Sequence, residues 1–192
     1  MTMPSWVPPG LKQAPMPLLR VQAFVNTRNL DARTDLLAGG GPAASWLREA
    51  GLLGPDAGVT EADLRVAREV RESIRGLLIR NAGDEPGDRD DLSPLRDLAG
   101  LGELRLNVAA SGAVELAPGP AGALTAGLLG LLLTIRDAQQ DGTWPRLRAC
   151  GNPDCLWAFY DRSHSRQGSW CEMSSCGNLM KNRGLRARRR AG

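Results

Sequence analysis

Histidine and cysteine, the side chains that most often carry nucleophilic, acid–base or metal chemistry, are scarce in this chain of 192 residues, which has one His and four Cys. All of them lie between positions 150 and 176, so the first 149 residues contain neither type. The chain also lacks a GxGxxG sequence, a phosphate-binding loop and a nucleophile elbow. Pairs of a nucleophile and a histidine base are therefore excluded from most of the chain, which leaves carboxylate chemistry as the catalytic alternative. We expect no enzyme.

Long apolar runs are absent as well. The longest, Ala123 to Ile135, is shorter than the ~20 residues that a helix needs to cross a bilayer. The N-terminus lacks the charged region, apolar core and small-residue cleavage site of an export signal. We therefore expect a cytoplasmic protein, and in that reducing compartment clustered cysteines are more often metal ligands than disulfides.

Charge is unevenly distributed along the chain. The formal net charge is +3, but from Arg146 onward ten basic and three acidic residues give +7, and the remainder gives −4. An acidic body with a strongly basic end predicts that the end meets a polyanion. The alternative is a solvated basic tail.

The four cysteines form two Cys-x4-Cys pairs, Cys150/Cys155 and Cys171/Cys176, separated by fifteen residues. Two such knuckles can converge on one tetrahedral Zn²⁺, and four thiolates leave no open position for water. The sequence therefore predicts one structural zinc ion rather than zinc catalysis. The single histidine, His164, could replace one cysteine, but four paired thiolates do not need it, and a surface position or a ligand contact is the alternative.

The rest of this segment has a simple pattern. The loops inside the two pairs can turn backbone N–H groups toward the thiolates, and Gly177-Asn178 suits a tight or left-handed exit from the second pair. Residues 156–160 have strand character, and a basic helix should start near Gly177. The candidate nucleic-acid contacts are on this helix and on the preceding hairpin: Lys181, Arg183, Arg186, Arg188, Arg189, Arg190, Arg162 and Arg166. Charges all around a helix suit phosphate contacts more than base reading.

The body should be mainly helical, with residues 1–17 as a proline-rich leader to which Trp6 adds an anchor. Residues 18–27 fit a helix or a strand, and residues 31–37 predict one or two helical turns. Helices are predicted at 42–53, at 61–80 with Thr60 as N-cap and Asp63 completing a capping box, and from Ser93 with Ser93 as the cap. Leu104 to Leu116 has the alternation of a hairpin, and 121–140 is apolar almost all round, as in a buried central helix. The predicted fold class is α+β: a mainly helical N-terminal domain with a small antiparallel hairpin, then a small four-cysteine zinc finger with a basic C-terminal helix.

Zinc binding should supply much of the folding free energy of the short cysteine segment. Chelation is expected to unfold residues 146–192 and to leave the body folded.

In the cysteine segment the chain resembles the CGNR zinc-finger family, bacterial proteins regarded as transcription regulators. The resemblance lies in the paired cysteines, the aromatic strand ending in Asp161-Arg162-Ser163, Trp170-Cys171, Cys176-Gly177-Asn178 and the arginine-rich tail. The body, with Asn26-Thr27 and the helix around Arg71-Glu72, is similar to the partner domain called ABATE. The resemblance implies a regulatory or dimerisation domain at 18–145, a zinc finger with its basic tail at 146–192, and DNA as the target. Leu179 stands where the family has the arginine of its name.

The leading hypothesis is that the protein is a zinc-finger transcription regulator that binds DNA. RNA is the alternative nucleic acid, and a homodimer is an assembly that this hypothesis allows. One alternative is a protein–protein adaptor stapled by zinc. Another is a small-molecule-binding protein that has lost DNA binding and grips a small anionic effector, since arginines hold carboxylates or phosphates bidentately. The candidate ligand-binding residues are Asn26, Arg28, Arg71 and Arg75. For Arg71 and Arg75 the simpler interpretation is a solvated helix face with local ion pairs.

Overall fold

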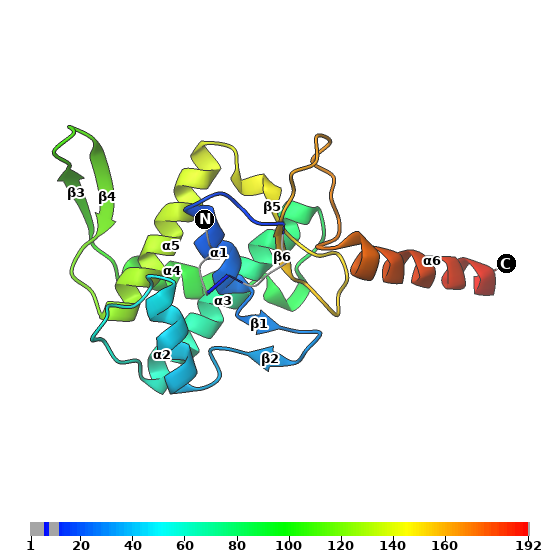
Figure 1. Cartoon of the computed structure of the whole chain (residues 1–192), viewed down its shortest axis with the longest axis horizontal. Helices are drawn as coiled ribbons and strands as arrows, with labels where there is room; N and C mark the ends of the chain where they lie inside the picture. Colours follow the sequence, from blue (N-terminus) through cyan, green and yellow to red (C-terminus); the bar gives the residue numbers. More distant parts are fainter. Residues whose placement is uncertain (1–5, 8–11, 192) are drawn as a thin grey trace.

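Helix α3 (Glu61–Ala82) lies at the centre of the molecule, and α1, α2, α4, α5 and β5 all contact it (Figure 1). The computed structural model describes residues 6–7 and 12–191. The predicted capping box is confirmed, because Thr60 Oγ1 accepts from Asp63 N–H at 3.1 Å while Asp63 accepts from Thr60 N–H at 2.8 Å. Gly83, with φ +88°, ends the helix in the left-handed conformation that glycine adopts at low cost. Buried Leu64, Ala67, Val70, Ile74 and Leu78 form the apolar face that the spacing predicts.

The sequence left a helix or a strand open for residues 18–27, and the structure has a helix there. Helix α1 (Leu18–Val25) is buried along almost its whole length. Helix α2 (Gly40–Glu49) follows after a turn and ends before Gly51. Near the start of the chain Trp6 is buried, and its carbonyl accepts from Trp46 Nε1 at 3.2 Å.

The prediction of helical turns at residues 31–37 is wrong. Strands β1 (Arg28–Asn29) and β2 (Thr34–Asp35) form a short antiparallel hairpin there. Asn29 Oδ1 accepts from Ala32 N–H at 3.0 Å, which closes a turn of the kind that asparagine favours. Asp35 lies in a strand rather than a helix because its carboxylate pairs there with Arg71 of α3.

The second half of the body contains the 3₁₀ turn η1 (Gly87–Arg89), α4 (Ser93–Gly100), the hairpin of β3 (Leu104–Val108) and β4 (Val114–Pro118), and α5 (Ala123–Gln140). The hairpin prediction is confirmed. Two other predictions for this part of the body, those for Ser93 and for α5, need correction. Ser93 is not the cap of α4, since it lies inside the helix and Asp91 Oδ1 accepts its N–H at 2.8 Å. Helix α5 is buried along one face only, and its Leu132 and Leu133 stay partly exposed because α3, not α5, occupies the centre.

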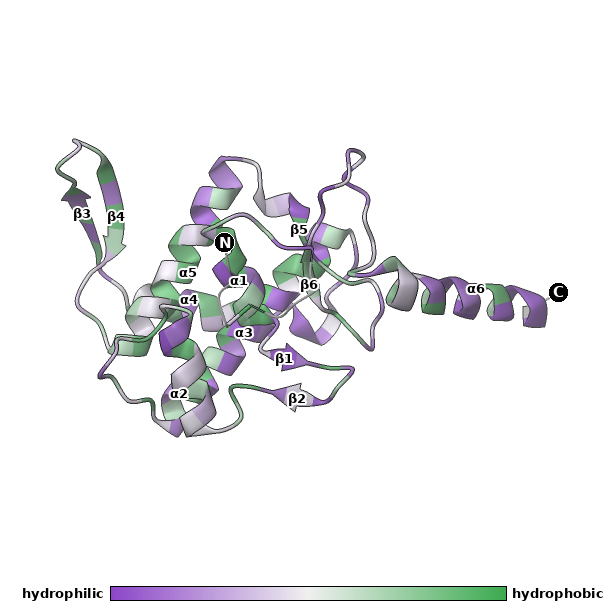
Figure 2. Ribbon diagram, in the orientation of Figure 1, coloured by the Kyte–Doolittle hydropathy of each residue, from purple (hydrophilic) through white to green (hydrophobic). Residues whose placement is uncertain are grey.

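The C-terminal part begins with the 3₁₀ turn η2 (Trp144–Arg146) and the antiparallel pair β5 (Leu147–Ala149) and β6 (Ala158–Tyr160). The π-helical turn η3 (Met173–Gly177) leads into α6 (Asn178–Ala191), which projects from the body (Figure 1). Hydrophilic residues recur along α6 in Figure 2. The fold class is α+β, as predicted.

One hydrophobic cluster joins the two parts. Leu147, Ala149, Ala158 and Tyr160 belong to the same buried cluster as the residues of α1 and α3. The boundaries 1–17, 18–145 and 146–192 stay a prediction, but β5 and β6 are packed as members of the body's core. Among the described residues, no helix has the length and apolar character needed to cross a membrane.

Candidate metal centre and basic helix

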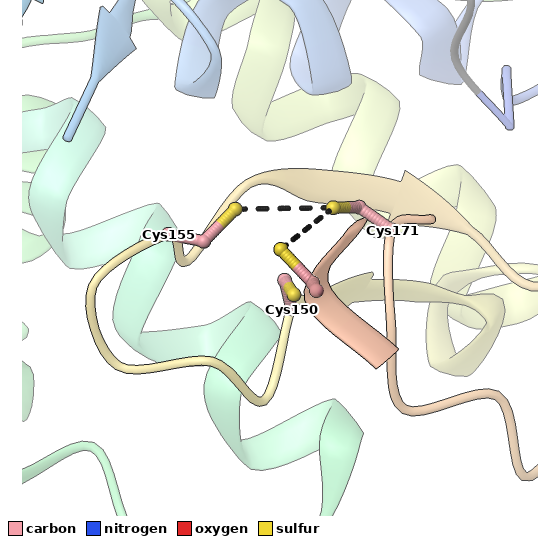
Figure 3. A group of neighbouring side chains, drawn as sticks. Cys150, Cys155 and Cys171 are labelled. Atoms are coloured by element: carbon pink, nitrogen blue, oxygen red, sulfur yellow. Dashed lines mark hydrogen bonds between the residues drawn. The ribbon is translucent and has the colours of Figure 1, made fainter. Parts of the chain in front are cut away.

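The four cysteine sulfurs lie within 4.8 Å of one another (Figure 3). The Sγ atoms of Cys155 and Cys171 are 3.8 Å apart, and so are those of Cys171 and Cys176. A tetrahedral zinc with Zn–S bonds of about 2.3 Å has S···S edges of about 3.8 Å. The side chains present therefore fit one four-thiolate zinc ion.

The backbone brings the two knuckles together. Cys150 directly follows β5, and its N–H donates to Trp157 O at 2.9 Å across the base of the first loop. Leu156, with φ +49°, turns the chain sharply after Cys155 and back into β6. In the second pair Cys176 lies in η3 and Cys171 lies two residues before it. Gly151 N–H donates to Ser169 O at 2.9 Å, which ties the first knuckle to the segment that precedes the second.

Backbone donors face the sulfurs, as the sequence predicts. The N–H groups of Cys171 and Asn152 donate to Cys150, and that of Trp157 donates to Cys155. Side-chain hydrogen bonds from Cys155 and Cys171 lower the pKa of Cys150 to about 2. The hydrogen bond to Cys150 in turn raises the pKa of Cys155 to about 12, and the pKa of Cys171 is raised for the same reason. The raised pKa keeps the thiols of Cys155 and Cys171 protonated when no cation is bound, so zinc binding must release protons.

Two neighbours support the sulfurs, and the sequence did not single out either as part of the site. Asn152 is 4% exposed and its Nδ2 lies 3.6 Å from Cys176 Sγ. The Trp170 ring lies against both loops, since a Cβ at Gly151 would be 3.2 Å and one at Gly177 3.1 Å from it. Of the two conformations expected at Gly177-Asn178, the left-handed one is not adopted, because Gly177 lies in the tight turn η3. A Cβ at Gly177 would overlap the sulfur of Met173 and lie 3.1 Å from the Trp170 ring, so a larger residue would force these side chains to shift.

The single histidine lies elsewhere. His164 is exposed in the loop that follows β6 and is not part of the sulfur cluster. The buried carboxylate of Asp161 shapes this loop, since it accepts the N–H groups of Ser163 at 2.9 Å and Gly168 at 2.7 Å.

Comparison with known families agrees with this architecture. A family model named ABATE, with the description "Putative stress-induced transcription regulator", matches residues 20–148. The chain belongs to the ABATE family. A second family model, the CGNR zinc finger, matches residues 146–189 and covers the sulfur cluster and most of α6. No curated protein matches the chain.

The candidate nucleic-acid contacts of this ABATE protein fall into two groups. Helix α6 has no acidic residue, and its basic side chains are exposed: Lys181, Arg183, Arg186, Arg188, Arg189 and Arg190. Arg183 pairs with Asp154 of the first knuckle at 2.9 Å, which ties α6 to the finger. Arg162 and Arg166 lie in the exposed loop after β6, where Arg162 donates to Gln13 O at 2.9 Å.

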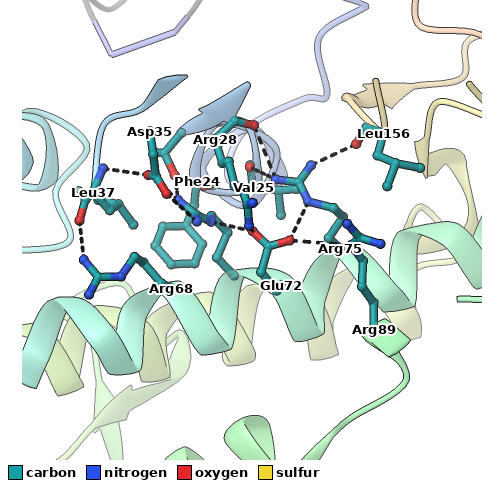
Figure 4. Close-up of polar contacts among 12 residues, drawn as sticks. Phe24, Val25, Arg28, Asp35, Leu37, Arg68, Glu72, Arg75, Arg89 and Leu156 are labelled. Atoms are coloured by element: carbon teal, nitrogen blue, oxygen red, sulfur yellow. Dashed lines mark hydrogen bonds and ion pairs between the residues drawn. The ribbon is translucent and has the colours of Figure 1, made fainter. Parts of the chain in front are cut away.

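The arginines proposed from the sequence as ligand contacts are buried in a network of their own (Figure 4). Arg71 and Arg75 are 1% and 0% exposed, so they do not form a solvated helix face. Arg71 holds Asp35 with two hydrogen bonds of 2.6 and 2.8 Å. Glu72 joins the two arginines, with its carboxylate 2.9 Å from Arg71 Nε and 3.0 Å from Arg75 Nε. These contacts favour a structural role for both arginines.

The same network reaches the zinc finger. Arg75 donates to Val25 O at 2.8 Å in α1 and to Leu156 O at 2.9 Å beside Cys155. Arg28 is the more exposed member, 3.6 Å from Glu72, and lines a cavity of about 300 Å³ formed by the β1–β2 hairpin. The sequence analysis did not identify Glu72 and Asp35 as partners of the two arginines. The available signal was that Arg71 and Arg75 lie four residues apart on an otherwise apolar helix face, where buried arginines need anionic partners.

Asn26 also binds the finger rather than facing a cavity of its own. It is 4% exposed, its Oδ1 accepts from Ala158 N–H at 2.8 Å, and its Nδ2 donates to Ala158 O at 2.9 Å. Asn26 thus extends the β5–β6 pair from the side of α1.

We expect Asn26→Ala to lower the free energy of unfolding by about 1–3 kcal/mol, because Ala158 N–H is then buried without an acceptor. Urea unfolding of the zinc-loaded protein measures this. Asn107→Ala, on the exposed β3–β4 hairpin, is the control and should change stability by less than about 0.5 kcal/mol. An equally small effect of Asn26→Ala would contradict the structural role.

Proposed function

We propose that this ABATE protein is a DNA-binding transcription regulator in which α6 contacts the phosphate backbone. The observation that supports the proposal is the exposed α6, which carries Lys181 and five arginines, has no acidic residue and projects from the body (Figure 1). Zinc fixes the start of this helix, because Cys176 lies in the turn that precedes Asn178. The metal's role is structural, and the binding energy comes from the basic side chains beyond it.

The charges surround α6 rather than lining one face. Their spacing suits phosphate contacts, which carry little sequence information. Leu179, 43% exposed at the start of α6, lines a cavity of about 430 Å³ together with Trp157 and three of the cysteines. Position 179 carries an apolar leucine where the family has an arginine, so this protein should bind DNA with one phosphate contact fewer than its relatives.

The test is a titration of duplex DNA at several salt concentrations with the zinc-loaded protein. About five phosphate contacts predict a fall in affinity of roughly 500-fold between about 50 and 200 mM salt. Removal of residues 181–192 should abolish this dependence. Arg65→Ala with Arg136→Ala removes two exposed charges from the body as a matched control and should leave the affinity almost unchanged.

A gain of function completes the test. Leu179→Arg should strengthen binding and steepen the salt dependence by about one further charge. Salt-independent or absent binding of DNA would refute the proposal. Equal binding of single-stranded RNA would redirect it to RNA, and an acidic protein that copurifies without nucleic acid would favour the adaptor alternative.

A further inference from the structure

The β3–β4 hairpin has one apolar face that the described part of the chain covers only near Leu116 and Pro118, which are half-buried. Across the two strands Leu104 pairs with Pro118, Leu106 with Leu116 and Val108 with Val114, so all six side chains lie on the same face. Four of them are among the most exposed large apolar residues of the protein: Leu104 at 55%, Leu106 at 71%, Val108 at 73% and Val114 at 67%. The other face is more polar, with Arg105, Asn107 and Glu115.

Such a hairpin is not stable by its own contacts. Two strands alone are marginal in water, and a one-sided apolar pattern is typical of strands packed against another surface. Figure 1 shows the hairpin projecting from the body, and only the root of β4 packs on α5. The alternation therefore indicates a partner that covers the apolar face.

A hollow near the root of the hairpin provides a second surface with apolar side chains. It has a volume of about 220 Å³ and lies between α3, α4 and α5, with Val66, Leu98, Leu124 and Leu128 among its walls. Leu101, 67% exposed, lines the hollow and lies just three residues before β3. The exposed apolar surface thus continues from the hollow into the hairpin.

We propose that two copies of this chain pair through this surface, with the hairpin of one copy seated in the hollow of the other. In a two-fold symmetric dimer, the hairpin of each copy lies in the hollow of the other, so the same residues form both contacts. A different partner would have to supply both a hairpin-like and a hollow surface. The exposed apolar side chains amount to roughly 500 Å² in each chain, and adjoining backbone and polar rim bring this close to the ~800 Å² per partner of a standard interface.

This dimer is independent of DNA binding. The hairpin and α6 lie at opposite ends of the molecule in Figure 1, so a variant that cannot dimerise still presents its basic helix. Loss of the dimer and loss of DNA binding can therefore be measured separately.

Analytical ultracentrifugation of the full zinc-loaded chain tests the proposal. We expect a dimer at micromolar concentration. Leu106→Lys should raise the dimer dissociation constant at least tenfold, and so should Val66→Lys in the hollow. Asn107→Lys adds the same charge at the next position but on the other face, and should leave the dissociation constant within about twofold.

Zinc content and the melting curve of each variant show whether it is folded, and hydrogen exchange of residues 104–118 gives a second measurement. Their protection should rise with protein concentration in the wild type and not in Leu106→Lys. A wild-type monomer at all concentrations, or equal effects of Leu106→Lys and Asn107→Lys, would overturn the proposal.

Discussion

Chelation of zinc is expected to unfold the chain from Cys150 onward and to lower the melting temperature of the body as well. The first effect follows because structural zinc contributes about 10–16 kcal/mol of apparent binding free energy to small sites at neutral pH. The second follows because Leu147, Ala149 and Ala158 flank the sulfur cluster and lie in the core shared with α1 and α3. Without the metal, the four sulfurs no longer hold the ends of β5 and β6 in place. The sequence alone suggested that the body would be unaffected.

Circular dichroism and calorimetry with and without a chelator measure both effects. Cys150→Ser removes a buried ligand and should reproduce the chelated state, with loss of stoichiometric zinc. Ser175→Ala, an exposed position in the second knuckle, is the matched control and should keep the metal. Full zinc content in Cys150→Ser would contradict the four-thiolate site, and an unchanged melting temperature of the chelated body would show two independent units.

Neutralising Glu72 is expected to have the second large effect. Its carboxylate lies between two fully buried guanidinium groups, those of Arg71 and Arg75. Glu72→Gln keeps the shape but leaves these charges with Asp35 as the closest remaining anion. Breaking such a buried pair costs about 3–5 kcal/mol. The exposed Glu69→Gln, on the same helix, is the control, and urea unfolding is the measurement.

The finger should loosen in the same variant, because Arg75 also holds Leu156 O next to Cys155. Faster release of zinc to a chelator in Glu72→Gln than in Glu69→Gln would report this. Equal stability of the two variants would show that the network contributes little.

The network also predicts the pH dependence of stability. Burial acts to raise the pKa of Glu72, but the charges of Arg75 and Arg71 outweigh it and the pKa is lowered. For Asp35 burial also acts to raise the pKa, but the hydrogen bonds from Arg71 and Leu37 N–H, together with the charges of Arg71 and Arg28, outweigh it, so its pKa is lowered too. Both carboxylates therefore stabilise the fold fully above the unfolded-state pKa of about 4, and this contribution is lost as pH falls through the lower folded-state values. Glu72→Gln should lose less stability than the wild type when the pH falls below about 4.

Several features followed from the sequence because short-range chemistry fixes them. Four cysteines in two close pairs specify a zinc site, because four thiolates complete the tetrahedral coordination of zinc without a further ligand. Thr60 and Asp63 specify the start of α3 through contacts three residues apart. The alternation from Leu104 to Leu116 specifies the β3–β4 hairpin in the same local way.

Other features depended on partners distant in the chain, and only the tertiary structure decided them. Residues 28–35 form a hairpin in which Asp35 pairs with Arg71 of α3. Arg71 and Arg75, for which the sequence favoured a solvated helix face over a ligand site, are buried and bind Glu72, Asp35 and backbone carbonyls. Asn26 binds Ala158 across 132 positions. Local patterns determine which residues bind zinc or begin a helix. The role of a polar side chain depends instead on which buried group needs a hydrogen-bond partner, and only the packing of the chain brings the two together.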